Sequence, residues 1–181
     1  GLTVVDLCAG SGAIGLEAAS RGAALVVISG CGLGLQLAGQ WRGRLALLEQ
    51  LRKMIHLLKG EIVYANSTLE EALCRVGSRT DGGLGKMFSS AGEEISRQTG
   101  ESLKEIWERQ VESLGKDCLL AKEDRKALAE LGANLGFLDT DMQERVLLLY
   151  LEKLDGEIGG LRGQVREKCR LYTGLGIMAG L

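Results

Sequence analysis

A chain of 181 residues can form one domain with a hydrophobic core and short additional segments. Its formal net charge of −2 gives no reason to expect nucleic acid among its partners, since nucleic-acid-binding surfaces are basic. The absence of proline and the 4% content of aromatic residues favour long helices over an enzyme with many loops. The five cysteines lie far from one another and from the only histidine, His56, so we expect no zinc or other metal site and no disulfide framework.

The first 22 residues carry a glycine motif of the kind that binds nucleotide cofactors. In the stretch VVDLCAGSGAIGLE, Gly10 and Gly12 open a match to G-x-G-x-x-G between an expected strand and an expected helix. Such glycines let the backbone approach a cofactor at the start of a helix. The stretch VVDLCAGSGAIGLEAASRGA resembles the first motif of S-adenosylmethionine-dependent methyltransferases, in particular those that modify guanine in ribosomal RNA. The resemblance implies that Asp6, Gly10 and Gly12 would contact the cofactor.

The sequence lacks the other parts of such a cofactor site. A dinucleotide or adenosyl site needs an acidic residue about 20 residues after the glycine loop, where it holds ribose hydroxyls. No Asp or Glu occurs between Glu17 and Glu49, and the proline-containing catalytic motif of those methyltransferases cannot occur in this chain. We therefore expect no cofactor and no catalysis, and we interpret residues 1–22 as a short strand–loop–helix remnant. A methyltransferase fragment is the alternative function.

Residues 23–41 are predicted to form a transmembrane helix. The stretch is uncharged, and about 20 residues at helical rise cover the hydrocarbon thickness of a bilayer. Gly30 and Gly34 have the G-x-x-x-G spacing that lets membrane helices pack closely. Because several residues of this stretch are Gly, Ser or Gln, a buried helix of a domain in water is the alternative.

Residues 42–170 are predicted to form a cytosolic helical bundle. Apolar residues alternate at spacings of three and four, which predicts one buried stripe on each of two helices. The first stripe comprises Leu48, Leu51, Ile55, Leu58 and Ile62, and the second comprises Leu147, Leu151, Leu154, Ile158, Leu161 and Val165. We expect the two stripes to pack against each other. His56 lies beside the first stripe, and we expect it at the surface rather than as a ligand.

Three pairs of polar residues have the spacing of a capping box, in which two side chains satisfy backbone amides at the start of a helix. They are Ser67 with Glu70, Ser102 with Glu105, and Thr140 with Gln143. We also expect the carboxylate of Asp139 at the start of the last helix, where the helix dipole favours an anion.

Residues 171–181 are predicted to form a truncated second transmembrane helix. They are uncharged but too few to span a bilayer, and Gly176 and Gly180 repeat the G-x-x-x-G spacing. Basic residues flank both predicted spans on the side of the central domain. This asymmetry predicts that the central domain faces the cytoplasm.

From about residue 24 to residue 181 the chain resembles stage III sporulation protein AB of endospore-forming bacteria. The stretches that carry the resemblance are LAGQWRGRL, LLKGEIVYANSTLEEAL, GKMFSSAGEEI, ESLKEIWERQV, LGANLGFLDTDMQERVLLLYLEKL and KCRLYTGLGIMAGL. The family has Thr-Pro-Leu where this chain has Ser67, Thr68 and Leu69, and its final hydrophobic helix continues beyond Leu181.

The resemblance implies a non-catalytic membrane platform in the complex that joins mother cell and forespore during endospore formation. Its helical domain would be similar to the cytosolic platform domains of type II secretion and type IV pilus machines. The protein would lie in the cell membrane, with this domain in the mother-cell cytoplasm. The expected partners are other proteins of the channel complex, including a cytosolic ATPase, and no nucleic acid.

Overall fold

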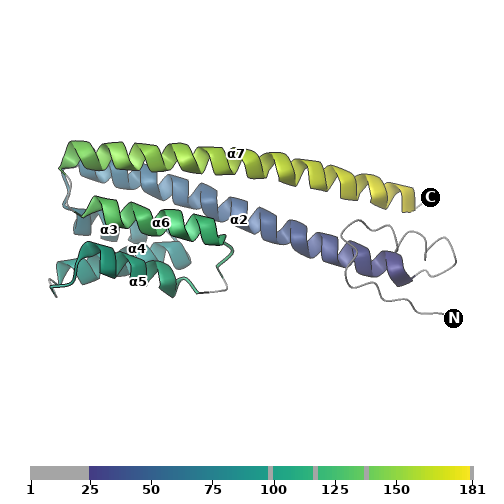
Figure 1. Ribbon diagram of the computed structural model, residues 1–181, viewed down its shortest axis with the longest axis horizontal. Helices are drawn as coiled ribbons and strands as arrows, with labels where there is room; N and C mark the ends of the chain where they lie inside the picture. Colours follow the sequence, from purple (N-terminus) through teal and green to yellow (C-terminus); the bar gives the residue numbers. More distant parts are fainter. Residues whose placement is uncertain (1–24, 98–99, 116–117, 137–138, 180–181) are drawn as a thin grey trace. The chain divides into compact units, whose positions relative to one another are not determined.

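The computed structural model describes the backbone of residues 25–97, 100–115, 118–136 and 139–179, and the side chains of these ranges between residues 39 and 167 (Figure 1). Its helices are α2 (Leu25–Val63), α3 (Leu69–Ser78), α4 (Gly83–Ser96), α5 (Leu103–Ser113), α6 (Lys122–Leu135) and α7 (Thr140–Ala179). These described ranges contain no strand, so the predicted all-α class is confirmed there. The strand–loop–helix remnant predicted at residues 1–22 lies outside the described residues, together with Asp6, Gly10 and Gly12.

The chain divides into two compact units. Residues 44–160 form one of them, which we call the helical domain, and residues 1–43 with 161–181 form the other. The helical domain contains the second part of α2, all of α3 to α6 and the first half of α7. Every contact used below lies within this domain.

Within the helical domain, α2 and the first half of α7 lie antiparallel. Arg52 Nη1 lies 2.7 Å from Asp155 Oδ1, and Lys59 Nζ lies 3.4 Å from Glu144 Oε1. The later residue of α2 thus contacts the earlier residue of α7, as in an antiparallel pair. The predicted apolar stripes are buried: Leu48, Leu51, Ile55, Leu58 and Ile62 on α2, and Leu147, Leu151, Leu154 and Ile158 on α7. Burial of these stripes contributes hydrophobic free energy to the fold.

Two further expectations concern single residues of the two stripes and their borders. Leu161 is buried, and Val165, the last residue predicted for the second stripe, is half-buried. His56 is exposed, as expected for a surface residue. After the first stripe α2 ends at Val63, and Asn66 has a φ of 52°, in the left-handed region that a right-handed helix does not use.

The four shorter helices form a consecutive series in which α3 packs on α4, α4 on α5, and α5 on α6. The approach of α3 to α4 depends on Gly92, where an added Cβ would lie 2.6 Å from Cys74 Sγ and 2.7 Å from the Glu70 carbonyl oxygen. Between α4 and α5, the rings of Phe88 and Trp107 meet edge to face, with centroids 5.2 Å apart. Both rings are fully buried and form the centre of the core in this part of the domain.

The capping box predicted at Ser102 is confirmed. The Ser102 hydroxyl accepts a hydrogen bond from the Glu105 backbone N–H at 3.3 Å, and the Glu105 carboxylate accepts one from the Ser102 backbone N–H at 2.9 Å. The hydrogen bonds that the Ser102 backbone N–H and hydroxyl donate to the Glu105 carboxylate lower the pKa of that group below its ordinary value. Two backbone amides that α5 cannot satisfy internally are thus paired at its first turn.

The capping boxes predicted at Ser67 and Thr140 are wrong, in each case because a neighbouring residue takes the N-cap position. Thr68 is the N-cap of α3, and no side chain caps that helix end with a hydrogen bond. At the start of α7, the Asp139 carboxylate accepts a hydrogen bond from the Met142 backbone N–H at 2.9 Å. The expectation of a carboxylate of Asp139 at this helix start is confirmed.

Among the described residues, no helix combines the length and the mean hydropathy that crossing a membrane requires. The transmembrane helix predicted at residues 23–41 is therefore not supported. From Leu25 onward that stretch belongs to α2, where Gly30, Gly34 and two glutamines lower the mean hydropathy. The stretch predicted as a truncated second span belongs to α7 as far as Ala179, and includes Gly176.

Candidate interaction site

A buried carboxylate joins three helices of the helical domain. Asp124 on α6 is only 6% exposed. Its two oxygens accept hydrogen bonds from Arg44 Nε at 2.7 Å and Arg44 Nη2 at 2.8 Å, in the bidentate geometry that suits a guanidinium group. Arg44 Nη2 also lies 3.4 Å from Glu157 Oε2 on α7. The contact with Asp124 raises the pKa of Arg44, so the cation is held in place between α6 and α7.

Asp124 also fixes the start of its own helix. One of its carboxylate oxygens accepts a hydrogen bond from the backbone N–H of Ala121 at 2.9 Å, one turn earlier. Burial, and to a lesser extent the charge of Asp124, raises the pKa of the Tyr150 hydroxyl on α7. The carboxylate therefore stabilises both the first turn of α6 and the attachment of α6 to the long helices.

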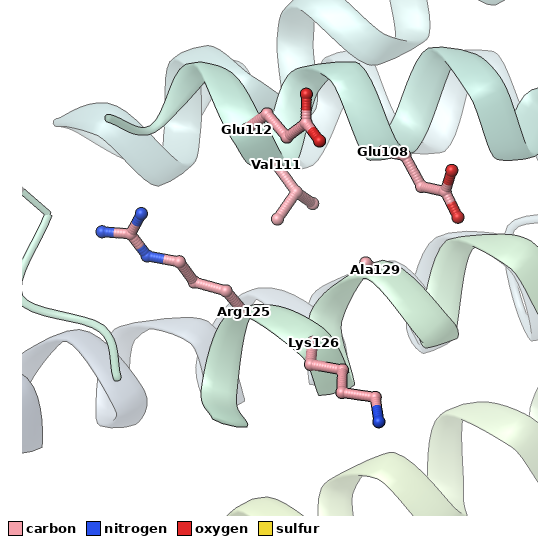
Figure 2. A pocket seen from close by; sticks show the side chains of 6 residues that line it. All are labelled: Glu108, Val111, Glu112, Arg125, Lys126 and Ala129. Carbon is pink, nitrogen blue, oxygen red and sulfur yellow. The ribbon is translucent and has the colours of Figure 1, made fainter. Parts of the chain in front are cut away.

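A shallow cavity opens between α5 and α6 (Figure 2). Its volume is about 390 Å³, and it is lined by Glu108, Val111, Glu112, Arg125, Lys126 and Ala129. Val111 points from α5 into the space between the two helices, whereas the Lys126 side chain extends from α6 away from α5. The cavity is open to solvent and is lined by two apolar residues and by side chains of both charges. Such a surface suits a polypeptide segment better than a small ligand, which needs an enclosed pocket.

Arginine side chains connect each of the two helices that border this cavity to neighbouring residues. Arg109 on α5 donates hydrogen bonds to Glu94 at 2.8 Å and to Glu101 at 2.7 Å. Its guanidinium group lowers the pKa of the Glu101 carboxyl group. On α6, Arg125 Nη2 donates to the Cys118 carbonyl oxygen at 2.8 Å.

The residues predicted to form sites are not brought together by the described part of the structure. Gly30, Gly34 and Gly176 lie in α2 and α7, and Gly180 lies outside the described residues, as do the cofactor residues of the alternative function. Within the described residues, no three His, Cys, Asp or Glu side chains form a group that could hold a metal ion. The Cys74 thiol is half-buried, and burial raises its pKa.

Sequence reasoning missed the Arg44–Asp124 pair and the α5–α6 cavity. The two charged residues are 80 positions apart, so no local spacing indicates that they meet. The one local signal was Asp124 itself, three positions after Ala121 at the start of α6, where a carboxylate can bond to a backbone amide.

The described residues of the helical domain are all-α: α2 and α7 lie antiparallel, and the four shorter helices pack on one another in series. Comparison with known proteins identifies the family. The sequence model of the stage III sporulation protein AB family matches residues 20–181, and the chain belongs to that family.

Two individual relatives agree with this assignment. The chain is 23% identical over 160 residues to "Stage III sporulation protein AB" of Bacillus subtilis (strain 168), covering 88% of this chain and 93% of that protein. A solved structure of "Stage III sporulation protein AB (SpoIIIAB)" superposes with a TM-score of 0.62 at 22% identity, covering 68% of this chain and 97% of that chain. At that identity, the structural likeness shows a shared fold.

A second family model, described as conserved hypothetical protein 95, matches residues 1–30. That description names no activity, so the comparisons give no support to the methyltransferase alternative. The division of the chain near residue 22 stays a prediction.

Proposed function

We propose that this protein is a non-catalytic scaffold of endospore formation, which acts by binding other proteins of the complex that joins mother cell and forespore. The observation that carries this proposal is the match of the sporulation family over residues 20–181, together with the shared fold. In this proposal the helical domain works as a platform similar to those of secretion and pilus machines. Its partners include a cytosolic ATPase.

The open cavity between α5 and α6 supports a scaffold role for the helical domain. A partner segment with charges of both signs would meet Glu108 and Glu112 on α5 and Arg125 and Lys126 on α6. Charge complementarity of this kind gives selectivity between partners rather than high affinity by itself. The Arg44–Asp124 pair supports the role indirectly, since it keeps α6 in place.

The proposed location is the mother-cell membrane, with the helical domain facing the cytoplasm. The experiment is fractionation of sporulating cells of the native host that express the tagged chain. Recovery in the membrane fraction is expected, and release by carbonate at high pH would indicate attachment through partners. Recovery of the chain only in the supernatant before any extraction would contradict the proposed location.

Deletion of the gene in the native host tests the function itself. We expect loss of heat-resistant spores, restored by a copy encoding the unchanged chain. A copy with Arg125→Glu and Lys126→Glu is expected to restore fewer spores, because it makes the cavity uniformly acidic. The matched control is Arg97→Glu, which reverses a charge at the C-cap of α4, away from the cavity. Normal sporulation of the deletion strain would overturn the proposal.

Catalysis is tested separately with the purified chain. Calorimetry with S-adenosylmethionine is expected to give no saturable heat. Saturable binding at a stoichiometry near one would overturn the non-catalytic part of the proposal and would restore the methyltransferase alternative.

A further inference from the structure

The side of α7 that points away from the core carries large apolar residues in solvent. Leu149 is 66% exposed and Met142 is 44% exposed. One further position on this side, Gly156, is open, since an added Cβ would meet no described atom within 4 Å. At about 100° per residue these positions share one side of the helix, opposite the buried stripe. Exposed apolar side chains that gather on one side of a helix favour an interaction surface there.

Two opposite charges border this apolar side. Arg145 and Glu152 are both exposed, and both lie to the same flank of Leu149 on the helix surface. The ion pairs that α7 makes to α2 use Glu144, Asp155 and Glu157 instead. Within the described residues, Arg145 and Glu152 therefore have no ion-pair partner.

We propose that this face of α7, comprising Met142, Arg145, Leu149, Glu152 and Gly156, binds the same face of a second copy of the chain in antiparallel orientation. In the sequence, Leu149 is the midpoint between Met142 and Gly156, and the midpoint between Arg145 and Glu152 lies half a residue before it. A twofold rotation about this point therefore places Leu149 beside its own copy. It also places Arg145 opposite Glu152 of the second copy, and Met142 opposite Gly156.

The charges of Arg145 and Glu152 and the sizes of Met142 and Gly156 favour the antiparallel pairing over a parallel one. In a parallel pairing, Arg145 would face Arg145 of the second copy and Glu152 would face Glu152, which is unfavourable. In the antiparallel pairing both ion pairs form, one on each side of the twofold axis. The missing side chain of Gly156 leaves a depression that accepts Met142, whose flexible side chain fills irregular gaps. The face is thus complementary to itself.

This inference does not depend on the proposed function, and its test uses the purified full chain. Sedimentation equilibrium over a range of concentrations is expected to show a reversible dimer of about twice 19.3 kDa. Arg145→Glu alone, or Glu152→Arg alone, places like charges opposite each other at both symmetry-related positions. Each is expected to weaken the dimer by about tenfold or more.

The double variant Arg145→Glu with Glu152→Arg exchanges the two charges and is expected to restore the dimer. The matched control is Lys86→Glu, which changes the net charge as much as Arg145→Glu at an exposed position of α4, outside this face. It is expected to leave the dimer unchanged. A monomer at all concentrations, or a dimer that Arg145→Glu does not weaken, would overturn the proposal and leave the face to a different protein.

Cross-linking gives a second readout that does not rely on charge. Leu149→Cys is expected to form a disulfide between copies under mild oxidation, because the two side chains meet at the twofold axis. Leu148→Cys is the matched control, since Leu148 is also exposed but points about 100° away. The unchanged chain gives the background from its own cysteines. Equal cross-linking of both variants would contradict the arrangement.

Discussion

Trp107 on α5 donates its indole N–H to the backbone carbonyl oxygen of Leu128 on α6 at 2.7 Å, within the core of the helical domain. That carbonyl oxygen is also positioned to accept the regular helical hydrogen bond from residue 132. Gly132 leaves room for the ring, because an added Cβ there would overlap the indole. The contact therefore joins α5 and α6 by a buried hydrogen bond and by close packing.

Gly132→Ala is expected to lower the free energy of unfolding by about 2–4 kcal/mol, because the new methyl group displaces a fully buried ring. Urea denaturation of the purified chain measures this change. Gly159→Ala is the matched control on an exposed helical position, where a Cβ meets no described atom within 4 Å. It is expected to raise stability by about 0.5–1 kcal/mol, since alanine favours a helix. Similar effects of the two variants would contradict the packing described for Trp107.

Arg44→Ala is expected to cost about 3 kcal/mol of unfolding free energy, because it leaves the carboxylate of Asp124 buried without its cation. The control is Arg52→Ala, which removes an ion pair of the same 2.7 Å length between two exposed side chains. That change is expected to cost less than about 1 kcal/mol. Equal costs, measured by urea denaturation, would show that burial does not distinguish the two pairs.

The parts of the fold that sequence alone predicts are those with a local pattern. The apolar stripes of α2 and α7 are visible as spacings of three and four, and Leu51, Ile55, Leu151 and Leu154 are buried as predicted. A spacing pattern reports which side of a helix is apolar. It does not report which other helix covers that side, so the order in which α3 to α6 pack on one another was not predictable.

The features of the candidate site have no such pattern. The carboxylate of Asp124 and the cavity between α5 and α6 depend on residues brought together from distant positions. Even a local pattern such as a capping box does not always predict which residue caps a helix. Ser102 and Thr140 have equivalent spacing to a Glu or Gln, but at the second site Asp139 occupies the N-cap position and competes successfully.

This competition can be measured by single substitutions at the start of α7. Asp139→Ala is expected to cost about 1 kcal/mol, because it removes the acceptor for the Met142 backbone N–H. Thr140→Ala is expected to change stability by less than about 0.5 kcal/mol, since Thr140 is exposed within the first helical turn. Thermal unfolding followed by circular dichroism compares the two. A larger loss for Thr140→Ala would reinstate the predicted capping box.

Acid sensitivity is expected at the junction of α2 and α3. A hydrogen bond from Arg75 to Glu61, at 3.0 Å, holds the pKa of the Glu61 carboxyl group below its ordinary value of 4.5, and Arg79 acts in the same direction. A carboxyl group with a lowered pKa in the folded state binds fewer protons there than in the unfolded state. Its contribution to stability is therefore present above 4.5 and is lost as the pH falls below that value.

The measurement is the urea midpoint at about pH 7 and about pH 4 for the unchanged chain and for Glu61→Gln. The variant is expected to have a lower midpoint at the higher pH and a smaller decrease on acidification, because glutamine cannot be protonated. The control is Glu71→Gln, whose carboxylate lies 4.0 Å from the same arginine on the exposed side of α3. It is expected to keep the decrease of the unchanged chain. An undiminished decrease in Glu61→Gln would place the acid-sensitive group elsewhere, with the Glu101–Arg109 pair the next carboxylate to substitute.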